Sequence, residues 1–186
     1  MDVTGTKPIK ILVTGPLRPP VGGTTVLFET LVAALLQRSD VELRLLPLPS
    51  VRRNLMRAAA PLLRHIVGLL RYTSESDVVS LHCNPRGLHA HVAVVSAITR
   101  LFGKPLVVRA FGGESLHEHA RLVGSDRFIR TLRKADLYLV ETRWQVQEAR
   151  DEGARVEWFP NHRQMPPEEH KRIEADGPCR RFDSFM

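Results

Sequence analysis

Cysteine is scarce in this chain, whose 186 residues include only Cys83 and Cys179. Two cysteines are too few for a disulfide framework, so we expect a reducing compartment, and the cytoplasm is the natural one. Long hydrophobic runs are also missing, and no stretch approaches the length that crosses a bilayer. These absences exclude disulfide-stapled secreted domains and proteins built on membrane-spanning helices.

Acidic residues are fewer than basic ones, which gives a net charge of +7. The excess is uneven, because residues 1–72 hold ten Lys or Arg and only four acidic residues. Such an excess favours anionic partners in general. Aromatic residues make up 6% of the chain, and no Lys/Arg-rich run is interleaved with them. We therefore expect no nucleic-acid partner.

Residues 9–36 lack both common phosphate-binding signatures. No Lys follows Gly22 or Gly23, as a P-loop requires, and no Gly-x-Gly-x-x-Gly spacing occurs. Kinases, ATPases and nicotinamide enzymes are therefore disfavoured. What is present is an apolar strand at 9–14, a loop that ends in the paired glycines, and a helix that Thr24 or Thr25 caps. This order is typical of the first unit of a nucleotide-binding α/β domain.

The paired glycines have two interpretations. Without a Cβ they let a ligand approach the backbone, and the helix N-terminus beyond them offers free N–H groups to a phosphate. A sharp turn with no ligand explains them equally well.

Strands and helices alternate along the rest of the chain. Further strands are predicted at 41–45, 77–81, 106–110, 137–140 and 156–159, and further helices at 51–72, 88–102, 126–134 and 144–152. The alternation predicts a Rossmann-like α/β fold, a parallel sheet with helices on both faces, in which the strand at 41–45 lies nearer an edge. The carboxyl ends of all strands then meet at one edge, where ligands bind. The residues expected there are Gly22, Gly23, His82, Cys83, Asn84, residues 109–114, Thr142 and Asn161.

Residues 51–72 are predicted to form a basic amphipathic helix that Pro61 kinks or splits. The segment holds five Arg and no acidic residue. One interpretation is a surface that contacts an anionic membrane. The other is an ordinary helix on the sheet with a solvated arginine face.

Residues 163–181 are polar and contain proline, as in a linker, and residues 182–186 look like the opening of another strand. We therefore expect one domain at 1–162. Residues 163–186 would be a linker and the beginning of a second domain.

Four segments together resemble the N-terminal half of family 4 glycosyltransferases, which have the two-domain GT-B fold. They are a strand followed by Pro19–Gly23; a strand ending in His82 ahead of an apolar helix and residues 103–105; Val107–Glu114; and Ala135–Asp136 followed by a strand, a helix and Val156–Asn161. Their order and spacing over about residues 9–161 carry the resemblance.

The resemblance implies transfer of a sugar from a nucleotide-sugar donor to a saccharide or lipid-linked acceptor, usually with retention and without a metal or other cofactor. The acceptor would lie on this domain and the nucleotide on a second one. Amides of the glycine loop would stabilise charge on the donor diphosphate. Without the second domain we expect little or no transferase activity.

The resemblance also assigns residues to this site. Donor-phosphate or acceptor contacts would come from Gly22, Gly23, Thr24, His82, Asn84, Gly112, Gly113 and Asn161. Many members have His where this chain has Phe111, which neither donates a hydrogen bond nor carries a proton. Arg109 and Glu114 are the polar groups left around it and are the catalytic candidates, with a structural salt bridge or a solvated loop as the alternative.

Metal binding is not expected. Zinc ligation by His82, Cys83, His89 and His91 would need side chains on one face, whereas adjacent strand residues point to opposite faces. A structural histidine is the alternative for His82.

Two other functions stay open. The chain could be a non-catalytic partner subunit that docks on a separate donor-binding chain. It could also be a hydrolase or epimerase, with Glu114 as its carboxylate. In the glycosyltransferase interpretation, peripheral contact through residues 51–72 would bring a polysaccharide-building enzyme to the inner membrane face.

Overall fold

The computed structural model describes residues 7–18, 21–49, 55–112, 115–123 and 130–161. Within them, six strands form one sheet in the order β2-β1-β3-β4-β5-β6, and every neighbouring pair is parallel. The strands are β1 Ile9–Gly15, β2 Val41–Pro47, β3 Val78–Cys83, β4 Leu106–Ala110, β5 Leu137–Val140 and β6 Val156–Trp158. The prediction of a Rossmann-like parallel sheet is confirmed, and β2 lies at an edge as expected.

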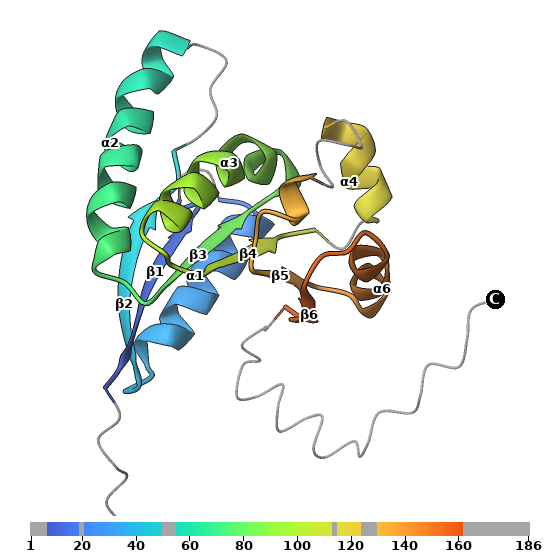
Figure 1. The fold of residues 1–186 in the computed structure, drawn as a ribbon, viewed down its shortest axis with the longest axis horizontal. Coiled ribbons are helices and arrows are strands. Elements are labelled where there is room, and N and C mark those ends of the chain that lie inside the picture. The colour runs from blue at the N-terminus through green and yellow to red at the C-terminus, as the bar shows by residue number, and fades with distance from the viewer. Residues whose placement is uncertain (1–6, 19–20, 50–54, 113–114, 124–129, 162–186) are drawn as a thin grey trace, which may run out of the picture.

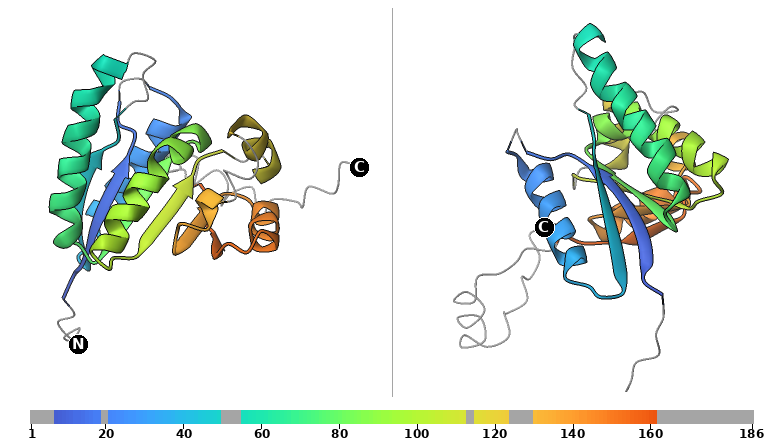
Figure 2. Two further views of the ribbon diagram at one scale, coloured as in Figure 1. Left: turned by 45° about the horizontal axis from the view of Figure 1, so that its top comes forward. Right: turned by 90° about the vertical axis from the view of Figure 1, so that its left-hand side faces the viewer.

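The helices divide unequally between the two faces of the sheet. They are α1 Gly23–Leu36, α2 Leu55–Ser74, α3 Pro85–Leu101, α4 Leu116–Val123 and α6 Arg143–Asp151. Figure 2 shows α1 on one side of β1 and β2, and α2 and α3 on the other. Residues of α4 and α6 join the same core cluster as α3. Among the described helices, α1 is therefore the only one that packs on its side of the sheet.

Neighbouring residues of each strand enter different cores, because successive side chains point to opposite faces. Leu12 belongs to the large cluster under α2, α3, α4 and α6, whereas Val13 belongs to a small cluster with Phe28 and Val32 of α1. Both faces of β1 are thus apolar at this point, as in sheets that are covered on both sides.

Two helices differ from the sequence prediction. α3 begins at Pro85, before the predicted start, because the Asn84 side chain accepts a hydrogen bond from the Gly87 N–H at 2.7 Å and caps the helix. α2 runs without interruption from Leu55 to Ser74 with Pro61 inside it (Figure 1), so of the two effects expected of Pro61, a kink or a split, the split does not occur.

The segment between β4 and β5 was only partly anticipated. The structure has a helix at Leu116–Val123 that the sequence pattern did not predict. The helix predicted at 126–134 falls partly outside the described residues, and of its described part residues 130–132 are helical. The expected boundary near residue 162 and the segment 163–186 also lie outside the described residues.

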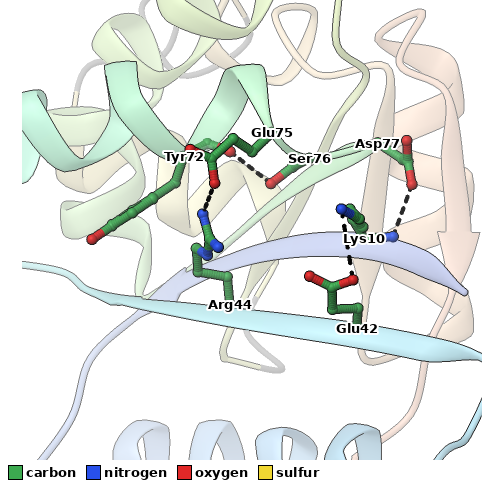
Figure 3. A network of polar contacts seen from close by, with 7 residues as sticks. All are labelled: Lys10, Glu42, Arg44, Tyr72, Glu75, Ser76 and Asp77. Carbon is green, nitrogen blue, oxygen red and sulfur yellow. Dashed lines mark hydrogen bonds and ion pairs between the residues drawn. The ribbon is translucent and has the colours of Figure 1, made fainter.

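A polar network holds the amino-terminal edge of the sheet together (Figure 3). The Lys10 backbone N–H donates to Asp77 Oδ2 at 2.8 Å, and the Lys10 ammonium lies 3.7 Å from Glu42. Arg44 of β2 pairs with Glu75, so β1, β2 and the turn before β3 are joined. This network lies at the edge opposite to the carboxyl ends of the strands. It stabilises the fold and is not part of the candidate site.

Candidate functional site

The paired glycines lie where the chain turns from β1 into α1. Gly22 precedes the helix in an extended conformation, with φ −159° and ψ 168°, and Gly23 is the first helical residue. Both are exposed, and a Cβ on either would meet no atom within 4 Å. The backbone conformation does not demand glycine at Gly22. What the two glycines provide is open space in front of the helix N-terminus.

Some of the amides at this terminus are occupied and others are open. The Gly22 N–H donates to Thr25 Oγ1 at 2.9 Å, and the same hydroxyl donates to the Gly22 carbonyl at 2.8 Å. Within the described part of the chain, the N–H groups of Gly23 and Thr24 have no acceptor, as the first turn of a helix leaves them. An anion in front of α1 would meet these two amides.

Arg18 is the basic residue in the described part of the loop before α1, and its side chain is already paired with Glu29. Its guanidinium contacts Glu29 of α1, and its backbone N–H donates to Glu29 Oε1 at 3.4 Å. The side-chain hydrogen bond raises the pKa of Arg18 and lowers that of Glu29. The pair ties the loop to α1 and leaves the backbone amides as the open donors.

His82 is buried at the end of β3, with 2% of its surface exposed. Its Nε2 lies 2.8 Å from Ser80 Oγ, and its ring packs beside Phe28 at 5.4 Å and Phe111 at 6.2 Å between ring centroids. Burial, and then the charge of Arg109, lower its pKa to about 3. The imidazole is therefore neutral at neutral pH, and the geometry favours the structural alternative for His82.

Cys83 lies on the other face of β3, in the large core cluster. Burial raises the pKa of its thiol, so the thiolate is not formed at neutral pH. His82 and Cys83 do not form a nucleophile–base pair.

Arg109 is buried on β4, directly opposite His82 in the sheet register, with 2% of its surface exposed. Its guanidinium lies between the rings of Phe111 and Phe159, at 4.8 and 4.6 Å from their centroids. One terminal nitrogen donates to Asn161 Oδ1 at 2.7 Å. Burial lowers the pKa of Arg109, while the charge of Glu141 acts in the opposite direction.

Arg109 keeps an unused donor. Its Nε is buried and has no hydrogen-bond partner among the described residues, and no carboxylate there forms an ion pair with the guanidinium. Glu114, the proposed partner of Arg109 in a structural salt bridge, and Gly113 lie outside the described residues.

The loop after β4 is held by residues that the sequence analysis did not select. Gly112 has φ 128°, a conformation that favours glycine. Its N–H donates to Glu141 Oε2 at 3.2 Å, and its carbonyl accepts from Gln145 Nε2 at 2.9 Å. Glu141 directly follows β5, so its place at the end of a strand was the available signal.

The structure brings some of the predicted residues together and separates others. His82, Arg109 and Asn161 form one connected group, together with Phe111 and Phe159. Asn84 is occupied as the cap of α3, and Gly22, Gly23 and Thr24 form the start of α1. Whether any of them contacts a ligand stays a prediction.

An apolar groove of about 210 Å³ lies on the α1 face of the sheet. It is bordered by α1, the inner strands and the end of β6. The residues that line it are Ile11, Val13, Leu31, Leu35, Val78, Ser80, His82, Val107, Leu139 and Phe159. The groove is the part of this face that α1 does not cover.

No group of three His, Cys, Asp or Glu side chains in the described ranges is placed to hold a metal ion. None of the described helices combines the length and the apolar character needed to span a membrane.

Comparison with known proteins identifies the fold. No protein-family model matches the sequence, and no curated protein matches it either. Among solved structures, the chain is similar to the crystal structure of Anabaena Alr3699/HepE in complex with UDP and glucose, with a TM-score of 0.50 and 12% sequence identity. The match covers 90% of this chain and 50% of HepE, so the chain spans about half the length of that protein. At this identity the likeness shows a common fold.

Proposed function

We propose that this chain is the acceptor-side half of a GT-B glycosyltransferase related to family 4. It would transfer a sugar from a nucleotide-sugar donor, with retention and without a metal, to a saccharide or lipid-linked acceptor at the cytoplasmic face of a membrane. The observation that carries the proposal is the open turn at Gly22 and Gly23 at the carboxyl edge of a parallel sheet, where the amides of Gly23 and Thr24 have no acceptor among the described residues. The fold likeness to a protein whose structure contains UDP and glucose supports the ligand class.

The chemistry of such a site follows from the amides. Negative charge grows on the donor diphosphate as the bond to the sugar breaks, and fixed N–H groups at a helix N-terminus stabilise that charge without reorganising. A second α/β half, in the same polypeptide or in a partner chain, would bind the nucleotide. The proposal therefore requires that half for activity.

The test places a negative charge where the phosphate would lie. Gly23→Asp puts a carboxylate in the first turn of α1, where it stabilises the helix but repels a phosphate. Gly23→Ala is the matched control, because a Cβ there meets no atom within 4 Å. Both variants would be assayed for transfer of radiolabel from nucleotide sugars, UDP-glucose first, by the chain co-expressed with its nucleotide-binding half.

The expected result is transfer by the wild type, retained but weaker transfer by Gly23→Ala, whose Cβ enters the open space, and loss of transfer in Gly23→Asp. Neither variant should melt at a lower temperature than the wild type. Full activity of Gly23→Asp would refute the phosphate-facing loop. Transfer by the purified 186-residue chain alone would refute the need for a second half.

A second candidate function is a non-catalytic partner subunit on the same fold. It is favoured by the burial of Phe111, which is 4% exposed against His82, at the position where many family members have His. In this case the chain would bind its donor-binding partner, and sugar transfer would continue when Gly23→Asp replaces the wild type in the complex.

A further inference from the structure

Helix α2 packs on the domain along one side and leaves apolar side chains exposed on another. One side packs on the domain through His65, Leu69 and Thr73, which are at most 4% exposed. The other side carries Leu63, Val67 and Leu70, which are 64%, 56% and 39% exposed. Apolar side chains that gather on an exposed side of a helix mark a surface that a partner covers. No described residue covers the second side of α2.

The three exposed residues form a continuous surface. Leu63, Val67 and Leu70 are spaced by four and three residues, so they lie on one stripe along the helix. We call them the α2 stripe. Figure 1 shows α2 at the outer margin of the molecule, and Figure 2 shows it on the side of the sheet opposite to α1. The stripe therefore faces away from the domain and is accessible to a large flat partner.

Charge indicates which partner the stripe fits. The exposed residues Arg64 and Arg71 follow Leu63 and Leu70 by one position each and so flank the stripe on one side. α2 contains no Asp or Glu. Glu75 follows α2 and lies close enough to Arg71 for their charges to interact, but it is already paired with Arg44. An apolar stripe flanked by arginines matches the boundary of an anionic bilayer, where apolar side chains enter the acyl region and guanidinium groups reach lipid phosphates.

The opposite side of α2 keeps the stripe in place. The His65 imidazole lies 3.0 Å from the Pro47 carbonyl through Nδ1, and its ring packs edge-on against His91 of α3 at 6.2 Å. The helix is therefore already folded and oriented before any contact with lipid, which removes the ordering cost that a disordered segment would have.

We infer that the α2 stripe docks this protein on an anionic lipid surface, with α2 lying flat in the headgroup region. The inference adds the contacting side chains and their orientation to the membrane location in the proposed function, but it does not need sugar transfer. Its test therefore gives the same answer whether or not the chain is part of an enzyme.

The experiment is vesicle flotation of the 186-residue protein with phosphatidylcholine vesicles, with and without 30% phosphatidylglycerol. We expect recovery with the anionic vesicles only, falling as salt is raised. Leu63→Ser/Val67→Ser should weaken binding about tenfold or more, because two side chains leave the acyl region. Arg64→Gln/Arg71→Gln should weaken it by more than about tenfold, since each arginine near the surface is worth about a factor of five.

Matched controls carry equally exposed apolar residues on other helices. Leu101 of α3 is 73% exposed and Val26 of α1 is 47% exposed, so Leu101→Ser and Val26→Ser should leave flotation unchanged. Circular dichroism melting of each variant shows whether it is folded.

Three outcomes would overturn the inference. The first is equal recovery with neutral and anionic vesicles. The second is a similar loss in the α2 and control variants. The third is a lipid-free wild-type dimer that Leu63→Ser/Val67→Ser converts to a monomer, because the stripe would then be an interface between copies of the chain.

Discussion

The backbone of Gly15 lies directly against the aromatic ring of Phe28. A Cβ built on Gly15 would lie 2.3 to 2.6 Å from three atoms of the Phe28 ring. Phe28 is fully buried between β1 and α1, so the ring has nowhere to move. The absence of a side chain at Gly15 is what lets α1 sit on the sheet.

Gly15→Ala should therefore destabilise the protein by about 1–3 kcal/mol through overpacking. Gly22→Ala is the control, since its Cβ would meet no atom within 4 Å, and its effect should be close to zero. Urea unfolding followed by circular dichroism measures both. Equal stability of the two variants would mean that the Phe28 ring adapts.

Arg109 is a buried cation without an ion-pair partner in the described part of the chain. Its contacts are two aromatic rings and the Asn161 amide oxygen. A buried charge held in this way contributes little net stability, because desolvation offsets the attraction.

Arg109→Met should change the free energy of unfolding by less than about 1 kcal/mol, because methionine keeps the packing between the rings and removes the buried charge. Arg109→Ala should cost about 2–4 kcal/mol through the cavity it leaves. If Arg109→Met instead costs as much as Arg109→Ala, the guanidinium itself holds the structure, and its candidacy as a catalytic group weakens. A stable Arg109→Met variant without transferase activity would support that candidacy.

Two buried histidines lie at the contact between helix α2 and helix α3. His65 and His91 are buried side by side between α2 and α3, and the Nε2 atoms of both have no partner among the described residues. Burial, and then the charge of His91, lower the pKa of His65 to about 4, and burial lowers that of His91. Both rings are neutral when the helix is docked.

Stability should therefore fall as the pH falls from about 6.5 to about 4. In this range the unfolded chain binds protons at His65 and His91 that the folded chain does not, which favours unfolding. We expect a loss on the order of 2–3 kcal/mol from His65. Urea unfolding at several pH values measures the slope, and His65→Gln should flatten it. An unchanged slope in His65→Gln would show that other groups, buried His82 among them, dominate.

The described helices cover one face of the sheet well and the other face only in part. Tyr138 and Val140 of β5 belong to the large core cluster, whereas Leu139 between them lines the apolar groove on the α1 face. Parallel sheets are normally covered on both faces. The groove is thus a surface that the described residues leave open.

A pair of substitutions on one strand measures this asymmetry. Val140 is 2% exposed, and Val140→Asn should cost about 3 kcal/mol or more, because it places an amide in a packed core. Leu139→Asn should cost about 1 kcal/mol or less, since water reaches the groove. Equal costs in chemical denaturation would show that the α1 face is as well covered as the other.

The site could be anticipated only in part, and particular residues show why. The carboxyl ends of the strands were placed at one edge by the alternation of strands and helices, so Gly22, His82, Arg109 and Asn161 were chosen correctly as edge residues. Gln145 was missed because its bond to Gly112 joins residues that are 33 positions apart. The helix at Leu116–Val123 was missed although Leu116, Ala120 and Val123 follow helical spacing, because its eight residues are fewer than such a pattern needs to stand out.

The sequence by itself determined the parallel α/β sheet, the edge position of β2 and the turn from β1 into α1. These follow from local patterns, since apolar runs, turn residues and their order are all carried by neighbouring positions. Only the tertiary structure decided that Arg109 is buried between two rings and that α2 leaves Leu63, Val67 and Leu70 exposed. Each of these depends on which surfaces meet after the chain has folded. The spacing of residues along the sequence does not show which distant segments come into contact.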